Sequence, residues 1–206
     1  MSDFAPSALE RLIYGIQTAV GRELGGIELA KLVYLVDIEK LRFFGETFTG
    51  EEYIRAPKGP LARNFRAAIA RMNGHEIEVR KVPSKGNSAW GKNCHRPGPD
   101  PRFSPDLSPI DQVILDRVLE RVQPLTLFEL VDLAYQTEPM RAVHGQATAG
   151  GTGTGRAVLD LGLIRRNERF LQWRLNTQVP REPDPEYEDF LEKEKAEVSL
   201  ILASPE

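Results

Sequence analysis

A glycine-rich stretch in the second half of the chain has the spacing of a phosphate-binding loop, Gly150-Gly151-Thr152-Gly153-Thr154-Gly155. A working P-loop places Lys after its last glycine, to reach the phosphates, and then Ser or Thr, to hold magnesium. Those two positions are Arg156 and Ala157 here, and no apolar strand precedes the glycines. We therefore interpret residues 145–155 as a connecting loop and expect no nucleotide cofactor.

Cys94 and His95 are the only adjacent thiol and imidazole, a combination that can act as nucleophile and base. A structural zinc site needs four ligands, and the other two histidines, His75 and His144, form no ligand pair by their spacing. We expect no metal, no cofactor and no catalysis here, so the chain is predicted not to be an enzyme. A single cysteine also excludes an internal disulfide and fits a reducing cytoplasm.

Asp37 is the most unusual carboxylate, because it interrupts an almost entirely apolar segment three residues after Tyr34. Residues three apart lie on the same face of a helix. Two interpretations remain open. Asp37 is either an acid or binding hot spot, or a buried carboxylate paired with Arg55, Lys58 or a backbone N–H, and we favour the second.

The amino-acid composition is typical of a globular protein. The 206 residues are 41% hydrophobic and 28% charged, which suits one domain of common size. The net charge of −3 does not indicate a nucleic-acid partner. The chain begins without a basic and apolar leader, and its most apolar run, 27–44, is interrupted by charges. We expect a cytoplasmic protein without a membrane partner.

Hydrophobic periodicity and capping residues predict a mainly α fold with a small antiparallel β component (α+β) around a helical core. The predicted helices are 7–25, 27–44, 60–72, 108–123, 126–136, 156–161 and a tail helix that begins at 184. The predicted strands are 52–57 and 76–82, which could pair with each other, and a hairpin over 163–175. The region 83–107, rich in Pro, Gly, Ser and Asn, is predicted to be a loop.

The charge is unevenly distributed, which suggests a domain over 1–180 and a separate acidic tail over 181–206. The tail holds nine acidic and three basic residues, a charge of −6 that leaves +3 for the rest of the chain. Tyr187, Phe190 and Leu191 lie on one face of the predicted tail helix. We expect this apolar face to pack against the body, a second subunit or a partner, so a homo-oligomer remains open.

Residues 108–175 have the element order of a winged helix: helix, helix, glycine-rich loop, short helix, hairpin. The short helix and the hairpin carry Arg156, Arg165, Arg166 and Arg169, which would contact nucleic acid. The recognition helix is otherwise mostly apolar, and winged helices also bind proteins. A DNA-binding transcriptional regulator is therefore the alternative function.

Two groups of residues carry a resemblance to a known family. The first group runs from the apolar helix to a Gly-Pro pair and comprises Lys31, Leu32, Tyr34, Asp37, Phe44, Gly45, Thr49, Gly50, Glu51, Tyr53, Ala56, Gly59 and Pro60. The second comprises Leu107, Ser108, Asp111, Leu115, Asp116, Val118, Leu119, Leu125, Thr126, Glu129, Leu130 and Leu133. Over residues 7–138 the chain resembles the Panacea domain family, which includes SocA-like antitoxins and GepA-like phage-associated proteins.

The resemblance implies a bacterial or phage protein that acts as the antitoxin of a type II toxin–antitoxin pair. Such an antitoxin binds its cognate toxin, the expected product of the neighbouring gene, and some members deliver the toxin to a protease. No catalytic residue is implied. We expect the contact surface to include Tyr53, Arg55 and Lys58, with Asp37 supporting them from beneath, and the tail residues Tyr187, Phe190 and Leu191 to form a second contact.

Overall fold

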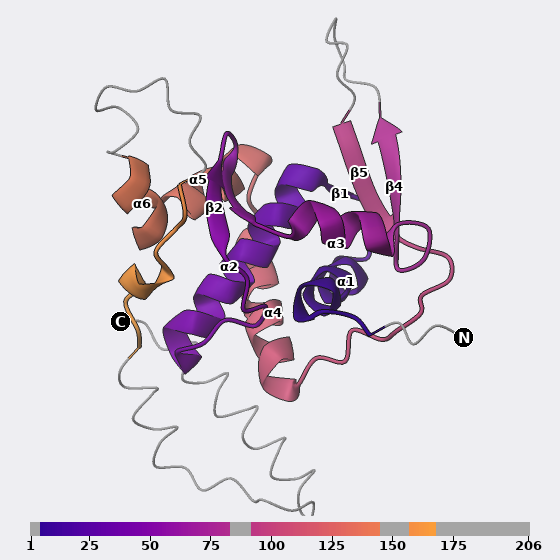
Figure 1. Ribbon diagram of the computed structural model, residues 1–206, viewed down its shortest axis with the longest axis horizontal. Helices are drawn as coiled ribbons and strands as arrows, with labels where there is room; N and C mark the ends of the chain where they lie inside the picture. Colours follow the sequence, from indigo (N-terminus) through magenta and orange to yellow (C-terminus); the bar gives the residue numbers. More distant parts are fainter. Residues whose placement is uncertain (1–4, 83–91, 145–156, 168–206) are drawn as a thin grey trace, which may run out of the picture.

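Helix α2, Gly26–Phe44, is the central element of the fold (Figure 1). The structure, a computed structural model, describes residues 5–82, 92–144 and 157–167. The other helices are α1 (Ala8–Val20), α3 (Phe65–Met72), α4 (Pro109–Val122), α5 (Leu127–Tyr135), α6 (Glu138–His144) and a 3-10 turn at Leu161–Leu163. Helices α1, α4 and α5 pack on α2, and α3 packs on α1. Every residue of α2 from Leu29 to Glu39 is buried, so all faces of this helix are packed against other parts of the core.

The helix ends follow from capping chemistry. At α1 the Ser7 hydroxyl accepts from Glu10 N at 3.2 Å, and the Glu10 carboxylate accepts from Ser7 N at 2.7 Å, which satisfies two free backbone donors. Thr126 and Glu129 form the same box at α5. Helix α2 ends at Gly45, whose φ of 76° is accessible to glycine without steric penalty.

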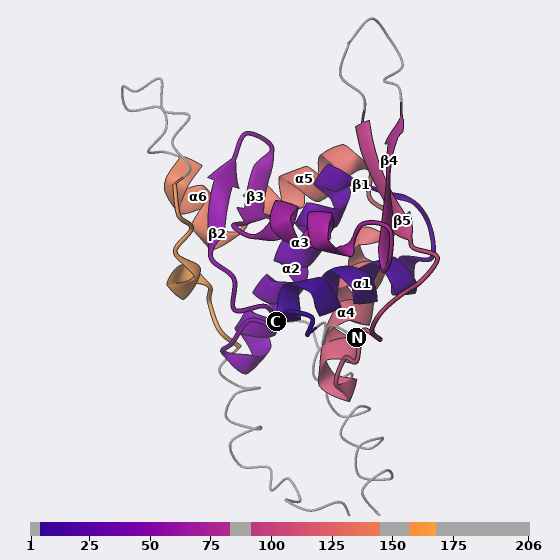
Figure 2. The ribbon, with the colours of Figure 1, turned by 45° about the vertical axis from the view of Figure 1, so that its right-hand side comes forward.

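Two antiparallel sheets lie on opposite sides of α3 (Figures 1 and 2). The first has the order β1-β5-β4 and is formed by Leu24–Gly25, Lys92–Pro97 and Ile77–Val82. The second is a hairpin of β2 (Tyr53–Ala56) and β3 (Gly59–Ala62), with Ala56 opposite Gly59. The outer edge of β2 is covered by 157–159, because Arg55 N donates to Ala157 O and Leu159 N donates to Tyr53 O, each at 2.8 Å.

The α+β class predicted from the sequence is confirmed, as are the strands at 52–57 and 76–82. Their predicted mutual pairing is wrong, because β2 pairs with β3 while β4 pairs with β5. The predicted helix over 60–72 begins only at Phe65, since Gly59–Ala62 are the returning strand of the hairpin. The predicted loop over 83–107 contains β5.

Of the winged-helix order considered for 108–175, the first two helices are present as α4 and α5, but the short helix and the start of the hairpin are not formed in the described residues. Residues 157–160, predicted to be helical, are extended, and Val158 makes an isolated bridge to Ile54. Residues 163–167, the start of the predicted hairpin, contain no strand. Helix α6 was not predicted. The glycine-rich loop at 145–155, the rest of the hairpin and the tail at 181–206 lie outside the described residues.

None of the helices in the described part of the chain is long and apolar enough to cross a membrane.

Candidate partner-binding groove

Asp37 anchors the segment that leads into the β2–β3 hairpin. Its side chain is 0% exposed and accepts hydrogen bonds from Phe48 N at 2.7 Å, Thr49 N at 3.0 Å and the Tyr53 hydroxyl at 2.8 Å, and also from the Thr49 hydroxyl. Burial raises the pKa of this carboxyl group, while the four hydrogen bonds oppose the shift. Of the partners expected from the sequence, backbone N–H groups are present, whereas neither Arg55 nor Lys58 bonds to Asp37.

Tyr53 holds the hairpin against α2 from within. It is 0% exposed, and its ring meets the Tyr34 ring edge to face with centroids 5.0 Å apart. Tyr34 is itself bonded through its hydroxyl to the Thr137 hydroxyl at 2.7 Å. Burial raises the pKa of the Tyr53 phenol well above its usual value. Tyr53 and Asp37 therefore position the hairpin and present no surface of their own to a partner.

The other residues expected at a contact surface are found in different settings. Arg55 is half-buried and donates through Nη1 to Val143 O at 3.1 Å, whereas Lys58 at the hairpin turn is exposed. Arg165 and Arg166 are exposed, but the recognition helix expected before them is not formed over 157–160. Tyr187, Phe190, Leu191, Arg156 and Arg169 lie outside the described residues.

A groove of about 1200 Å³ opens between the hairpin, α3 and the first turns of α2. Its lining is mostly apolar: Leu61 contributes from β3, and Phe65, Ile69 and Ala70 contribute from α3. The sheet contributes Val79 and closes the groove at its far end. Among the expected contact residues that the structure describes, only Lys58 lines the groove, because the hairpin turn forms part of the wall.

Lys31 lines the groove from α2 and is only 2% exposed. Its Nζ donates to Pro60 O at 2.7 Å. Proline is tolerated at position 60 because its backbone nitrogen faces the outer edge of β3. This follows from the pairing, since Arg55, the residue opposite Pro60 in the hairpin, donates its own N–H outward to Ala157 O. Gly59 is required beside it: its φ is 96°, and a Cβ there would lie 3.0 Å from Lys31 Cε.

We expect the free energy of unfolding to rise with pH because of Lys31. Burial lowers the pKa of its amine to about 8, from 10.5. The unfolded chain therefore binds more protons than the folded chain between these values, so stability increases as the pH rises through this window. Between pH 8 and 9.5 the gain should be roughly 1 to 2 kcal/mol. Urea unfolding of wild type and Lys31→Met tests this, because the methionine variant should lack the increment; equal pH slopes for the two would contradict it.

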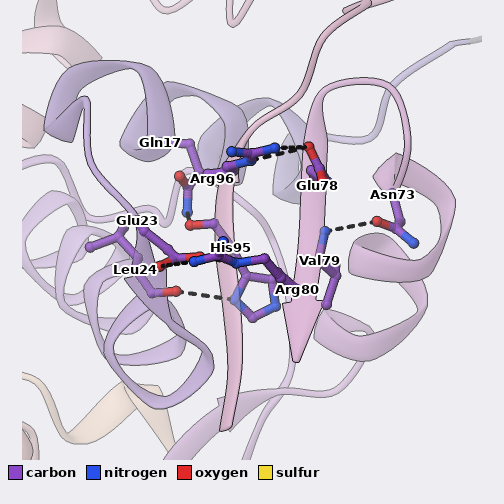
Figure 3. A network of polar contacts seen from close by, with 9 residues as sticks. All are labelled: Gln17, Glu23, Leu24, Asn73, Glu78, Val79, Arg80, His95 and Arg96. Carbon is purple, nitrogen blue, oxygen red and sulfur yellow. Dashed lines mark hydrogen bonds and ion pairs between the residues drawn. The ribbon is translucent and has the colours of Figure 1, made fainter. Parts of the chain in front are cut away.

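The far end of the groove is the face of the β1-β5-β4 sheet around His95 (Figure 3). His95 is 3% exposed, its Nδ1 lies 3.4 Å from Leu24 O, and its carbonyl accepts from Gln17 Nε2 at 3.3 Å. Burial lowers the pKa of this imidazole. A Cβ on Gly26 would lie 3.1 Å from His95 Cε1, so the first turn of α2 packs directly on the ring. These contacts fix His95 as part of the groove wall.

Cys94 and His95 do not form a reactive pair in this geometry. Neighbouring residues of a strand project to opposite faces of the sheet, so the thiol and the imidazole point apart. Across the described ranges of the chain, no three His, Cys, Asp or Glu side chains are grouped in a way that could hold a metal ion.

The charged groups around the groove are mainly basic. Lys58 and Arg66 are exposed on its rim. Among the described lining residues Glu28 is the one carboxylate, and both of its oxygens already accept hydrogen bonds: Oε1 from Arg22 Nη2 at 2.6 Å and Oε2 from Gly25 N at 3.3 Å. The groove therefore favours an anionic group.

An exposed apolar patch adjoins the groove at the start of α5. Leu127 lines the groove and is 40% exposed, and the next residue, Phe128, is 88% exposed. Neither residue was predicted to contact a partner from the sequence. The exposure of Phe128 was nevertheless detectable from the sequence, because Phe128 lies two residues before the buried Leu130 and so falls on the opposite face of the helix.

Comparison with protein families identifies the part of the chain that forms most of the groove. A family model described as antitoxin SocA-like, Panacea domain, matches residues 29–139, more than half of the 206 residues. This confirms the resemblance indicated by the residues between Lys31 and Pro60. The match spans most of α2, the hairpin, α3 and both strands β4 and β5. No curated protein and no solved structure matches the chain.

Proposed function

The chain belongs to the family of SocA-like antitoxins with a Panacea domain, and from this premise we propose that it neutralises a cognate toxin by binding it directly. A member of an antitoxin family has a cognate toxin as its partner. Direct contact is the mechanism that the surface of this molecule supports best. The family match is the observation that carries the proposal.

The shape of the groove supports a polypeptide partner. Small-molecule sites usually measure about 300 to 1,000 Å³ and enclose their ligand on most sides. The groove, at about 1200 Å³, is larger, and its lining includes Leu127, which the exposed Phe128 follows in the chain. Exposed aromatic side chains beside a concave apolar surface are typical of protein interfaces.

We propose that Lys58, Arg66 and Phe128 contact the toxin, with the hairpin held in place by Asp37 and Tyr53. These three side chains are exposed in the described part of the chain; Lys58 and Arg66 line the groove, and Phe128 follows Leu127, which lines it as well. The tail over 181–206, with Tyr187, Phe190 and Leu191, remains a proposed second contact.

Co-expression with the neighbouring gene tests the proposal. Induction of the neighbouring gene product alone should arrest growth of the host, and co-expression of this chain should restore it. The control is the same plasmid with an early stop codon in this chain, which keeps the transcript and removes the protein. Co-purification of the two proteins should accompany rescue. A neighbour without toxicity, or toxicity that this chain does not relieve, would refute the antitoxin function.

A further inference from the structure

The lysine inside the groove differs from the buried glutamates, because no residue in the described part of the chain forms an ion pair with it. The buried carboxylates Glu10, Glu39 and Glu76 each pair with an arginine. Lys31 is 2% exposed, yet among the described residues no carboxylate lies within ion-pair distance of its Nζ. A buried charge without a counter-charge is unfavourable, so a partner that supplies one gains binding energy.

The donor capacity of Lys31 is also only partly used. An ammonium group has three N–H donors, and the Pro60 carbonyl takes one of them at 2.7 Å. Two donors remain for a group that enters the groove. Because the surrounding wall is mostly apolar, an ion pair formed there would be screened by salt much less than a surface pair.

We propose that the groove binds a segment of the toxin in which an aspartate or glutamate lies between apolar residues, and that this carboxylate forms an ion pair with Lys31 Nζ. The proposal rests on the antitoxin function. The apolar neighbours in the toxin segment pack on Leu61, Ile69 and Ala70, and the basic rim of Lys58 and Arg66 attracts the acidic segment. The proposed ligand of the groove is therefore a segment of the toxin that contains a carboxylate between apolar residues.

Two variants test the groove, and one serves as a matched control. Lys31→Met removes the amine and keeps an unbranched side chain. Ala70→Glu adds volume and a negative charge to the groove from an exposed position of α3. Ala67→Glu makes the same change at an exposed alanine of the same helix that does not line the groove. Thermal melting first establishes that all three fold.

Affinity for the purified toxin, the product of the neighbouring gene, is then measured by titration calorimetry. Lys31→Met should bind about 30-fold more weakly, because it leaves the toxin carboxylate unpaired. Ala70→Glu should bind about 100-fold more weakly, because it places like charges together and obstructs the groove. Ala67→Glu should stay within about threefold of wild type, as expected for a rim or non-contact position.

The outcomes separate this proposal from the proposed function. If wild type binds the toxin and both groove variants bind equally well, the groove is not the site, and the antitoxin function stands. If wild type does not bind or rescue, both proposals fail. Carbodiimide cross-links from Lys58 to carboxylates of 181–206 that persist unchanged when toxin is added would assign the groove to the chain's own tail and overturn the proposal.

Discussion

Replacement of Asp37 by alanine is expected to lower the free energy of unfolding by about 3 to 5 kcal/mol. The substitution removes the common acceptor of two backbone N–H groups and two hydroxyls, from Phe48, Thr49 and Tyr53. The site is 0% exposed, so water cannot take over these donors without opening the core. Urea unfolding followed by circular dichroism measures the loss.

Two milder variants locate the source of this effect. Tyr53→Phe removes a single donor and keeps the ring on Tyr34, so it should lose only about 1 to 2 kcal/mol. Asp37→Asn keeps the shape and one carbonyl acceptor and should fall between the two. If Asp37→Ala unfolds at the same urea concentration as wild type, the network does not hold the hairpin on α2.

The second large effect is expected at Glu76, which is 0% exposed and accepts three bonds from Arg102. Arg102 N, Nε and Nη2 donate at 2.9, 3.0 and 2.8 Å. Glu76→Gln should lower the free energy of unfolding by about 2 to 3 kcal/mol at neutral pH. The expected loss of stability is smaller than for Asp37→Ala because the Arg102 side chain is 28% exposed and can reach water.

The effect of Glu76→Gln should disappear in acid. Burial raises the pKa of Glu76, but the hydrogen bonds from Arg102 outweigh burial and hold the pKa below its usual 4.5. The contribution of the carboxylate is therefore complete above pH 4.5 and is lost as the pH falls through the lowered pKa. Urea unfolding of wild type and variant at several pH values measures this.

Glu78→Gln is the matched control for this pair. Glu78 also bonds to an arginine, Arg96, at 2.6 Å, but its side chain is 41% exposed and that of Arg96 is 50% exposed. Solvent-exposed pairs contribute about 0 to 1 kcal/mol, so this variant should change little at any pH. An equal loss for Glu76→Gln and Glu78→Gln would show that burial does not determine the strength of the pair.

Helix starts and the central helix were predictable because their causes are local. The Ser7–Glu10 and Thr126–Glu129 boxes and the apolar run around Leu32 need only neighbouring residues. The missed elements depend on distant partners. Pro60 is equally suited to the first turn of a helix and to an edge strand, and only its pairing with Arg55 decides between them. Strand β5 is polar and gains its order from β4 and β1.

The candidate site was predictable only in part, for the same reason. The strand before Lys58 was predicted, and Asp37 was expected to support it, but the returning strand Gly59–Ala62 that completes the hairpin was not. Lys31 belongs to the family motif, but its isolation from counter-charges depends on α3, β3 and the sheet, which come together only in the folded chain. The sequence distance between Lys31 and Val79 conceals that both line one groove.

The covered edge of β2 limits how far the chain can be shortened for expression. Residues 157–159 occupy the N–H of Arg55 and the carbonyl of Tyr53, and they lie beyond residue 139, where the family match ends. A protein cut at that limit would leave these backbone groups free on a strand edge, and such edges act as templates for pairing between molecules. Trimmed forms should therefore aggregate more readily than the full chain, so expression should extend past residue 159.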